Sequence, residues 1–238
     1  MSQMNAVWRL RRGMDRRFRQ GHPWVYSNEL LESPKGLTPG GSVELQDAGG
    51  KFLALGYGNP KSLIAFRCLS RDVNLKNPMA MDPVVATLVR AGRLRIAVGL
   101  GDVSHRLCFG EADFLPGLVI DRYSLKDGQV FVVQAHTAGA NFWMGSILEI
   151  LERYVAALAA GQEIGKEVWK KTSVVLRNDL RVRVLEGLEE ESPRVLKSVP
   201  GIELENVQIR VASVLAPFSQ SVLNFNVNLI SGQKTGFF

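Results

Sequence analysis

Short apolar runs separated by glycine-rich turns fill the first 74 residues, and this spacing most constrains the fold. Two turns lie at residues 37–41, with the sequence LTPGG, and at residues 47–50. Gly56, Gly58 and the pair at 59–60 interrupt the pattern again. The runs with strand-like composition are residues 7–10, 24–26, 42–46, 51–57 and 63–69. Five short strands in so few residues predict a small barrel.

Arginine is concentrated near the amino end. Between residues 9 and 19, six arginines stand against a single acid, Asp15, which leaves this segment at +5 while the whole chain is at +6. The six are Arg9, Arg11, Arg12, Arg16, Arg17 and Arg19. A planar guanidinium can bind a phosphate through two hydrogen bonds and can stack on a base. The local charge, together with the pI of about 9.5, predicts a polyanionic partner.

Three flat side chains follow the arginines, namely His22, Trp24 and Tyr26. Cationic side chains beside exposed rings are what single-stranded or looped RNA requires of a binding surface. We therefore assign RNA binding to the six arginines and His22. The alternative is a solvated basic strand or turn with Trp24 and Tyr26 in the core.

The composition excludes several classes of protein. Apolar residues make up 46% of the chain and charged residues 22%, as in ordinary globular proteins of one or two domains. No apolar run has the length of a membrane helix, and the polar N-terminus is unlike a signal peptide, so we expect a cytoplasmic protein without a membrane partner. Cys68 and Cys108 are isolated and are expected to be buried thiols. With three scattered histidines, no metal site is expected.

Residues 75–188 have the pattern of a compact α+β unit. A linker at residues 72–83 precedes it, and helices are predicted at 84–98 and 141–160 from apolar residues at helical spacing. The predicted strands are residues 107–109, 118–120, 130–134, 168–176 and 180–185. Their order around the second helix makes an α+β domain.

The segment RLCFGEADFLPGLVIDRY at residues 106–123 carries an unusual set of charges. Its chemistry-bearing residues are Arg106, Glu111, Asp113, Gly117, Asp121 and Arg122. Carboxylates at strand ends allow acid–base catalysis, and an independent enzyme built on Glu111, Asp113 and Asp121 is one hypothesis. The stronger interpretation is a structural motif in which arginine–carboxylate pairs hold the loop.

Residues 189–238 begin with an acidic, proline-marked connection. Two strands, at residues 207–215 and 222–229, are predicted to form a hairpin, and the chain then runs to GQKTGFF. Two aromatic residues at the end predict that something further packs against them.

Four motifs in order resemble the ribosomal RNA large subunit methyltransferase I family, whose members use S-adenosylmethionine (SAM) to methylate C5 of cytosine in ribosomal RNA. The motifs are RRFRQGHPWVYSNEL (16–30), RLCFGEADFLPGLVIDRY (106–123), LRNDLRVRVLEGL (176–188) and QKTGFF (233–238). The resemblance implies a PUA-like RNA-binding pseudo-barrel at 1–74, a β-β-α-β-β domain at 75–188, and a linker and β-hairpin at 189–238. It also implies that Lys234, Thr235 and Gly236 border the cofactor pocket of a catalytic domain that would follow.

The resemblance stops before the family's catalytic domain. The glycine-rich SAM loop, the Asp-Pro-Pro motif and the catalytic cysteine have no counterpart here, and neither Cys68 nor Cys108 lies in a matching motif. The chain is therefore predicted to bind no cofactor and to be inactive alone, although the full-length family uses SAM.

The sequence thus predicts a β-rich α+β protein that is the RNA-binding N-terminal portion of a SAM-dependent rRNA (cytosine-5) methyltransferase. The expected partner is RNA, in particular large-subunit rRNA, and a homodimer is left open. The alternative is a stand-alone RNA-binding or scaffolding module without catalytic activity.

Overall fold

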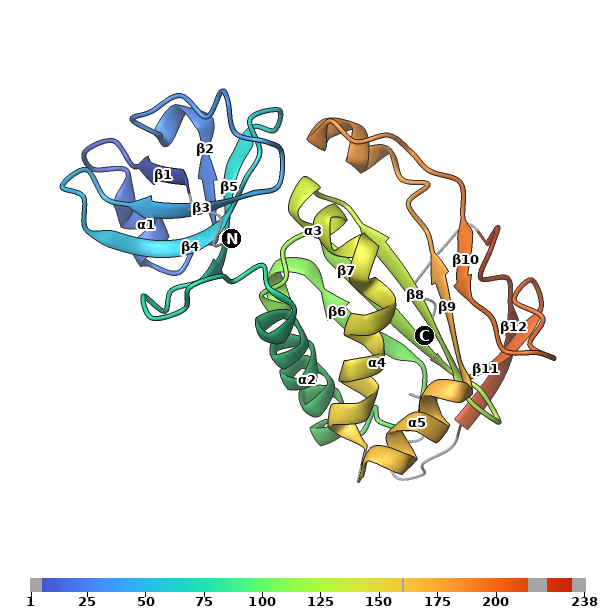
Figure 1. The fold of residues 1–238 in the computed structure, drawn as a ribbon. Coiled ribbons are helices and arrows are strands. Elements are labelled where there is room, and N and C mark those ends of the chain that lie inside the picture. The colour runs from blue at the N-terminus through green and yellow to red at the C-terminus, as the bar shows by residue number, and fades with distance from the viewer. Residues whose placement is uncertain (1–5, 160, 214–221, 233–238) are drawn as a thin grey trace.

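The computed structural model describes residues 6–159, 161–213 and 222–232, and it contains two β-sheets that belong to successive parts of the chain (Figure 1). The first sheet has five strands in the order β1-β3-β4-β5-β2. Its strands are β1 (Ala6–Arg9), β2 (Trp24–Tyr26), β3 (Gly41–Gln46), β4 (Phe52–Gly58) and β5 (Ile64–Ser70). The five runs expected from the sequence are therefore confirmed as strands.

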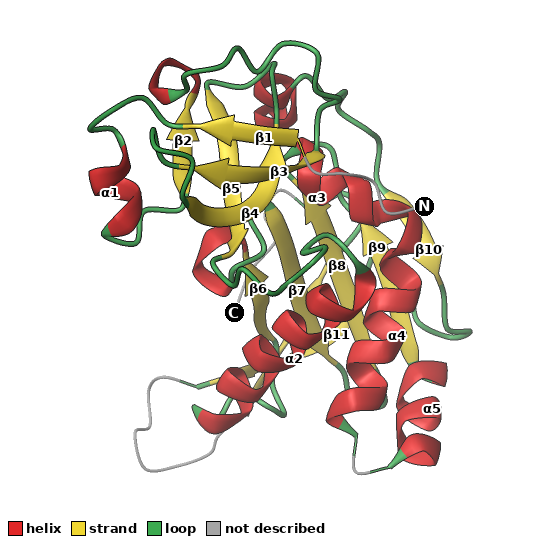
Figure 2. Cartoon of the chain, turned by 60° about the vertical axis from the view of Figure 1, so that its left-hand side comes forward, coloured by secondary structure: helices red, strands yellow, loops and turns green. Residues whose placement is uncertain are grey.

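The N-terminal sheet curls around an apolar core (Figure 2). β1 pairs in parallel with β3, while the other pairings are antiparallel. The short helix α1 (Asp15–Arg19) buries Phe18 in this core, and η1 (Ser27–Glu29) follows β2. Gly58 is the last residue of β4, and it has no room for a side chain, because an added Cβ would be 2.4 Å from the nearest ring carbon of Trp8.

The second sheet contains seven strands, in the order β10-β9-β8-β7-β11-β12 with β6 paired to β7. The strands are β6 (His105–Phe109), β7 (Leu118–Ser124), β8 (Gln129–Ala135), β9 (Thr172–Leu176), β10 (Arg194–Lys197), β11 (Val207–Ala212) and β12 (Val222–Val227). β8 and β9 are parallel, as expected where helices connect two strands. The sheet continues past residue 188, so the strands of the predicted C-terminal hairpin extend the central sheet.

Helices cover one face of the second sheet (Figures 1 and 2). They are α2 (Met81–Ala97), α3 (Ala138–Phe142), α4 (Ile147–Leu158) and α5 (Gln162–Lys170), with η2 (Gly110–Asp113), η3 (Trp143–Ser146) and η4 (Arg181–Glu186) in the connections. Alternation along β8 explains the two-sided core, because Phe131 and Val133 pack under the helices while Val130 and Val132 face a second cluster with β11. The β-rich α+β class predicted from the sequence is confirmed.

Of the predicted strands, the one at residues 168–176 is wrong in part and the one at residues 180–185 is wrong throughout. Residues 162–170 form α5, and the strand begins only at Thr172. Residues 181–186 form the 3₁₀ helix η4, although their apolar alternation is typical of a strand. Arg183 is the reason, since its buried guanidinium donates to the carbonyls of Ala135 and Glu189 and holds this segment off the sheet edge. β10 pairs with β9 in its place.

None of the helices in the described part of the chain is both long enough and apolar enough to span a membrane.

Candidate nucleic-acid interface

The six arginines lie on and beside α1, and acids from elsewhere in the chain approach three of them. Arg9 pairs with Glu32 at 2.6 Å, and Arg17 pairs with Glu29 at 3.0 Å. Arg19 pairs with both Asp15 and Asp47. Three of the six arginines therefore pair with four carboxylates, of which only Asp15 lies within residues 9–19. The net positive charge of the folded surface is lower than the net charge of that segment alone.

Arg12 and Arg16 are the cations of this group that remain free. Both side chains are exposed, and their guanidinium groups make no ion pair or hydrogen bond with the described residues. Arg11 differs, because its Nε donates to the carbonyl of Leu30. A free guanidinium can bind a phosphate without first leaving an acid. Arg12 and Arg16 are therefore the strongest candidates for phosphate contacts.

The aromatic residues after the arginines are half-buried rather than fully in the core. Arg17 lies 5.0 Å from the centre of the Tyr26 ring, and His22 meets Trp24 edge to face at 5.6 Å. Trp24 also donates from Nε1 to Glu111 at 2.7 Å. Trp24 thus connects the end of the arginine segment (residues 9–19) to the GEAD segment (residues 110–113), since Glu111 lies 87 residues after Trp24 in the sequence.

A buried ionic network joins the two sheets at this point. Arg67 on β5 donates to Glu111 and to Glu186, at 3.1 and 2.8 Å, and lies over the Trp24 ring. Glu186 also accepts from Asn59 and Ser62. Both Arg67 and Glu186 are buried, and a buried charge of this kind is tolerated only when it is paired and hydrogen-bonded. This network connects the N-terminal sheet to the second sheet with its helices and connections, which we call the central unit.

A second contact lies beside it. Tyr57 on β4 is buried, and its hydroxyl bonds to the carbonyl of Pro116 at 2.9 Å and to the hydroxyl of Thr137 at 2.8 Å. Burial raises the pKa of Tyr57, so the hydroxyl stays protonated and can donate. Gly117, next to Pro116, has a positive φ of 72° and touches Thr137 where any side chain would clash.

The acids of residues 106–123 are held by arginines. Asp121 pairs with Arg106 at 2.8 Å, and Asp113 pairs with Arg95 and also accepts the backbone N–H of Phe109. Burial raises the pKa of Asp121, against the opposite effect of its Arg106 bonds. Arg122 donates to the side chain of Gln129 and the carbonyl of Gly101. These contacts stabilise β6, β7 and the loop between them.

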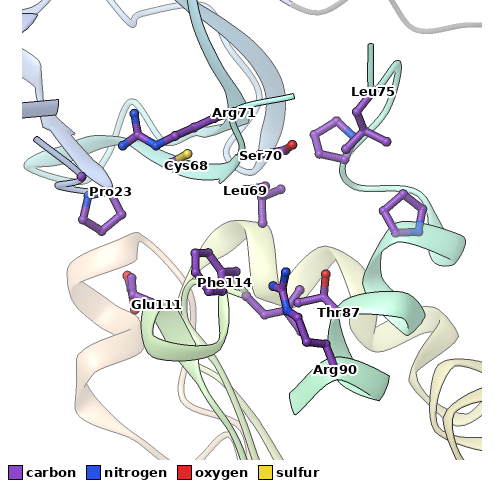
Figure 3. A pocket seen from close by; sticks show the side chains of 14 residues that line it. Pro23, Cys68, Leu69, Ser70, Arg71, Leu75, Thr87, Arg90, Glu111 and Phe114 are labelled. Carbon is purple, nitrogen blue, oxygen red and sulfur yellow. The ribbon is translucent and has the colours of Figure 1, made fainter. Parts of the chain in front are cut away.

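An open pocket of about 550 Å³ lies between the two units (Figure 3). Leu69 points into it from the end of β5, while Phe114 and Arg90 reach up from the central unit. Its other walls come from the loop before β2, β5, the linker, α2, η2 and the loop after η2, and they are Gly21, Pro23, Cys68, Ser70, Arg71, Leu75, Pro78, Pro83, Thr87, Glu111 and Leu115. The pocket therefore adjoins the end of the arginine segment.

Sequence reasoning missed the residues that shape this pocket. Arg90 lies on the helix predicted at residues 84–98, and its guanidinium is 4.7 Å from the centre of the Phe114 ring. The sequence feature that could have pointed to Phe114 as a pocket residue is its position directly after GEAD, in a predicted loop. Cys68 also lines the pocket and is only half-buried, unlike Cys108, which is fully buried as expected. Burial still raises the pKa of Cys68 to about 11, so its thiol is protonated at neutral pH.

The connection between β8 and α3 leaves no room for a cofactor beside its glycine. β8 leads directly into α3, which contains Gly139, but the ring of Tyr57 fills the space beside that glycine, where an added Cβ would be 2.4 Å from the ring. Lys234, Thr235 and Gly236, expected near a cofactor, lie outside the described residues. In the part of the chain that the structure describes, no cluster of acids, histidines and cysteines could hold a metal.

Comparison with known proteins agrees with the fold. Residues 9–71 match the family model of a PUA-like domain. Ribosomal RNA large subunit methyltransferase I from Erwinia tasmaniensis is 28% identical over 231 residues, 96% of this chain and 50% of that protein. The protein of the same name from Pseudoalteromonas translucida is 30% identical over 239 residues, 99% of this chain and 52% of its own length.

Solved structures show the same arrangement. A Streptococcus mutans protein, provisionally named a SAM-dependent methyltransferase, superposes with a TM-score of 0.59 at 14% identity, over 98% of this chain and 51% of that one. At this identity the likeness concerns the fold alone. The chain spans about half the length of the curated relatives it matches. Residues 9–71 are thus a PUA-like domain, and the chain as a whole is a homologue of the Ribosomal RNA large subunit methyltransferase I proteins over about half of their length.

Proposed function

We propose that this chain is the RNA-binding portion of a SAM-dependent rRNA (cytosine-5) methyltransferase, and that it recognises and positions large-subunit rRNA in the cytoplasm. The names of its relatives supply methyl transfer and large-subunit rRNA, and the use of SAM and the cytosine C5 position come from the family resemblance of the sequence motifs. The observation that carries the RNA-binding role is the exposed arginine surface of the PUA-like domain, in particular the free guanidinium groups of Arg12 and Arg16.

In this proposal the chain binds RNA and leaves methyl transfer to a catalytic domain. SAM would supply the methyl group when bound there. The chain's own residues hold the RNA backbone, and the Arg67–Glu186 network keeps the PUA-like domain at a fixed distance from the central unit. A rigid support of this kind would place the target base reproducibly.

Salt dependence of binding tests the proposal. Each phosphate contact with single-stranded RNA contributes about 0.7 to the slope of log affinity against log salt concentration. The double change Arg12→Ala and Arg16→Ala should make this slope shallower by about 1.4. Titration of labelled rRNA fragments at several salt concentrations measures it.

A matched control is the double change Lys166→Ala and Lys170→Ala on α5, which removes the same charge from exposed pairs with Glu163 and Glu167. This variant should keep the slope of the unmodified chain. Binding that ignores salt, or that loses equal slope in both double variants, would contradict the proposal.

A further inference from the structure

Phe114 has a left-handed backbone conformation that side chains rarely adopt. Its φ is 62°, and it is the one non-glycine residue with positive φ among those the structure describes. A bulky side chain in this left-handed region is strained, and such outliers gather at functional sites. The residue ends η2, and its N–H bonds to the carbonyl of Glu111. This conformation holds the ring away from the core.

The ring of Phe114 is exposed at the pocket, with 59% of the residue accessible to solvent. The next residue in the same loop, Leu115, is by contrast buried in the core of the central unit. An exposed phenyl ring on the wall of a pocket is a flat surface on which another ring can stack. Figure 3 shows it reaching into the space below Leu69.

Arg90 supplies charge at the same place. Its side chain is exposed, and its guanidinium makes no ion pair or hydrogen bond with the described residues and lies over the Phe114 ring. Arg71, on the opposite wall, donates to the carbonyls of Phe18 and His22 and keeps its positive charge at the pocket edge. Glu111 is the acid of the lining, and Arg67 pairs with it. The pocket therefore favours an anionic ligand that carries a flat ring.

Polar groups and size narrow the ligand further. The hydroxyls of Ser70 and Thr87 and the carboxylate of Glu111 can hydrogen-bond to a ligand edge. A volume of about 550 Å³ lies within the range of small-molecule sites and exceeds what one base needs. Gly21 and Pro23 line the pocket and follow the arginine segment directly, so one strand of RNA can contact both.

We propose that this pocket takes one unpaired base of the bound RNA. The base stacks on the face of Phe114 opposite Arg90, and Arg90 contacts an adjacent phosphate. The assignment rests on the proposed function, because it deepens the RNA-binding role, and it adds residues of the central unit to the interface.

The test uses the full chain and single-stranded RNA oligonucleotides in which 2-aminopurine replaces each base in turn. Stacking on Phe114 should quench the fluorescence at one or two positions, and Phe114→Ala should remove the quenching. The same change should weaken binding about tenfold, as the loss of a stacked base does, while leaving the salt slope unchanged. Arg90→Gln should instead make the salt slope shallower by about 0.7.

Each variant has a control on an equally exposed side chain outside the pocket. Phe142→Ala removes an exposed ring from α3, and Arg93→Gln removes a charge from the same helix as Arg90. Phe114→Tyr should retain binding and quenching. RNA binding with no quenching at any position, or with equal losses in Phe114→Ala and Phe142→Ala, overturns the base pocket but leaves the arginine surface intact. Failure of the unmodified chain to bind RNA overturns both proposals.

Discussion

At the scale of single residues, the fold keeps a few side chains in conformations or environments that cost stability. Phe114 is the clearest case, because its backbone is left-handed and its ring is exposed. Arg183 is another, since its side chain is buried and bonds mostly to carbonyl oxygens. Arg183 holds η4 in place. The exposed ring of Phe114 stabilises little and is explained better by a ligand.

The backbone cost at Phe114 can be measured apart from the ring. Phe114→Gly and Phe114→Ala both remove the phenyl group, but only glycine adopts positive φ without strain. We expect the glycine variant to have a free energy of unfolding about 1 kcal/mol higher than the alanine variant. Urea denaturation of the two variants gives the difference. An alanine variant as stable as the glycine variant would show that the loop relaxes.

At the scale of elements, the sequence predicted strands with alternating burial well and failed at two segments, one with a buried charge and one with a close contact between helices. Residues 180–185 alternate like a strand, yet Arg183 directs them into η4. Residues 162–170 form α5, and Gly165 lets this helix approach α4 closely, since an added Cβ would be 2.9 Å from the Cα of Ala156. Contacts between distant residues decide both cases, and periodicity does not record them.

β6 carries a prediction about pH. Its first residue, His105, is buried, and burial lowers the pKa of the imidazole to about 4, with smaller contributions from Arg122 and Arg95. The ring donates from Nδ1 to the carbonyl of Val103. In the unfolded chain the pKa is near 6.5, so the unfolded state takes up the proton first as pH falls. The stability that neutral His105 contributes is complete above about pH 6.5 and is lost toward pH 4.

We therefore expect His105→Asn to flatten the pH profile of stability. Between pH 7 and pH 4 the unmodified chain should lose about 2 to 3 kcal/mol more free energy of unfolding than the variant does. Urea titrations at both values of pH measure the two losses. Equal losses would mean that the folded state accepts the proton on His105 without cost.

At the scale of the whole molecule, three side chains of the PUA-like domain hydrogen-bond to one carboxylate of the central unit. Glu186 accepts from Arg67, Asn59 and Ser62, and all three come from the PUA-like domain. Glu186 itself ends η4 in the central unit. Removal of one partner from a buried charged network leaves the other charge without compensation.

Glu186→Ala should lower the free energy of unfolding by about 3 kcal/mol, because Arg67 keeps only its bond to the less buried Glu111. Hydrogen exchange should also speed up in β5 and η4 before the core strands are affected. Glu163→Ala, which breaks an exposed pair with Lys166, is the control and should change stability little. If exchange at the contact does not change, the apolar neighbours hold the two units together without the network.

By itself, the sequence determined the local structure and the family resemblance. Glycine turns and alternating apolar residues specify strands within a few positions, and the motifs at residues 16–30 and 106–123 carried the likeness that the comparisons confirm. Only the tertiary structure decided which charges are free. Glu29, Glu32 and Asp47 form ion pairs with three of the N-terminal arginines. Trp24 donates a hydrogen bond to Glu111, which is 87 residues away in the sequence. Such pairings depend on distances in space, which the order of residues along a chain does not specify.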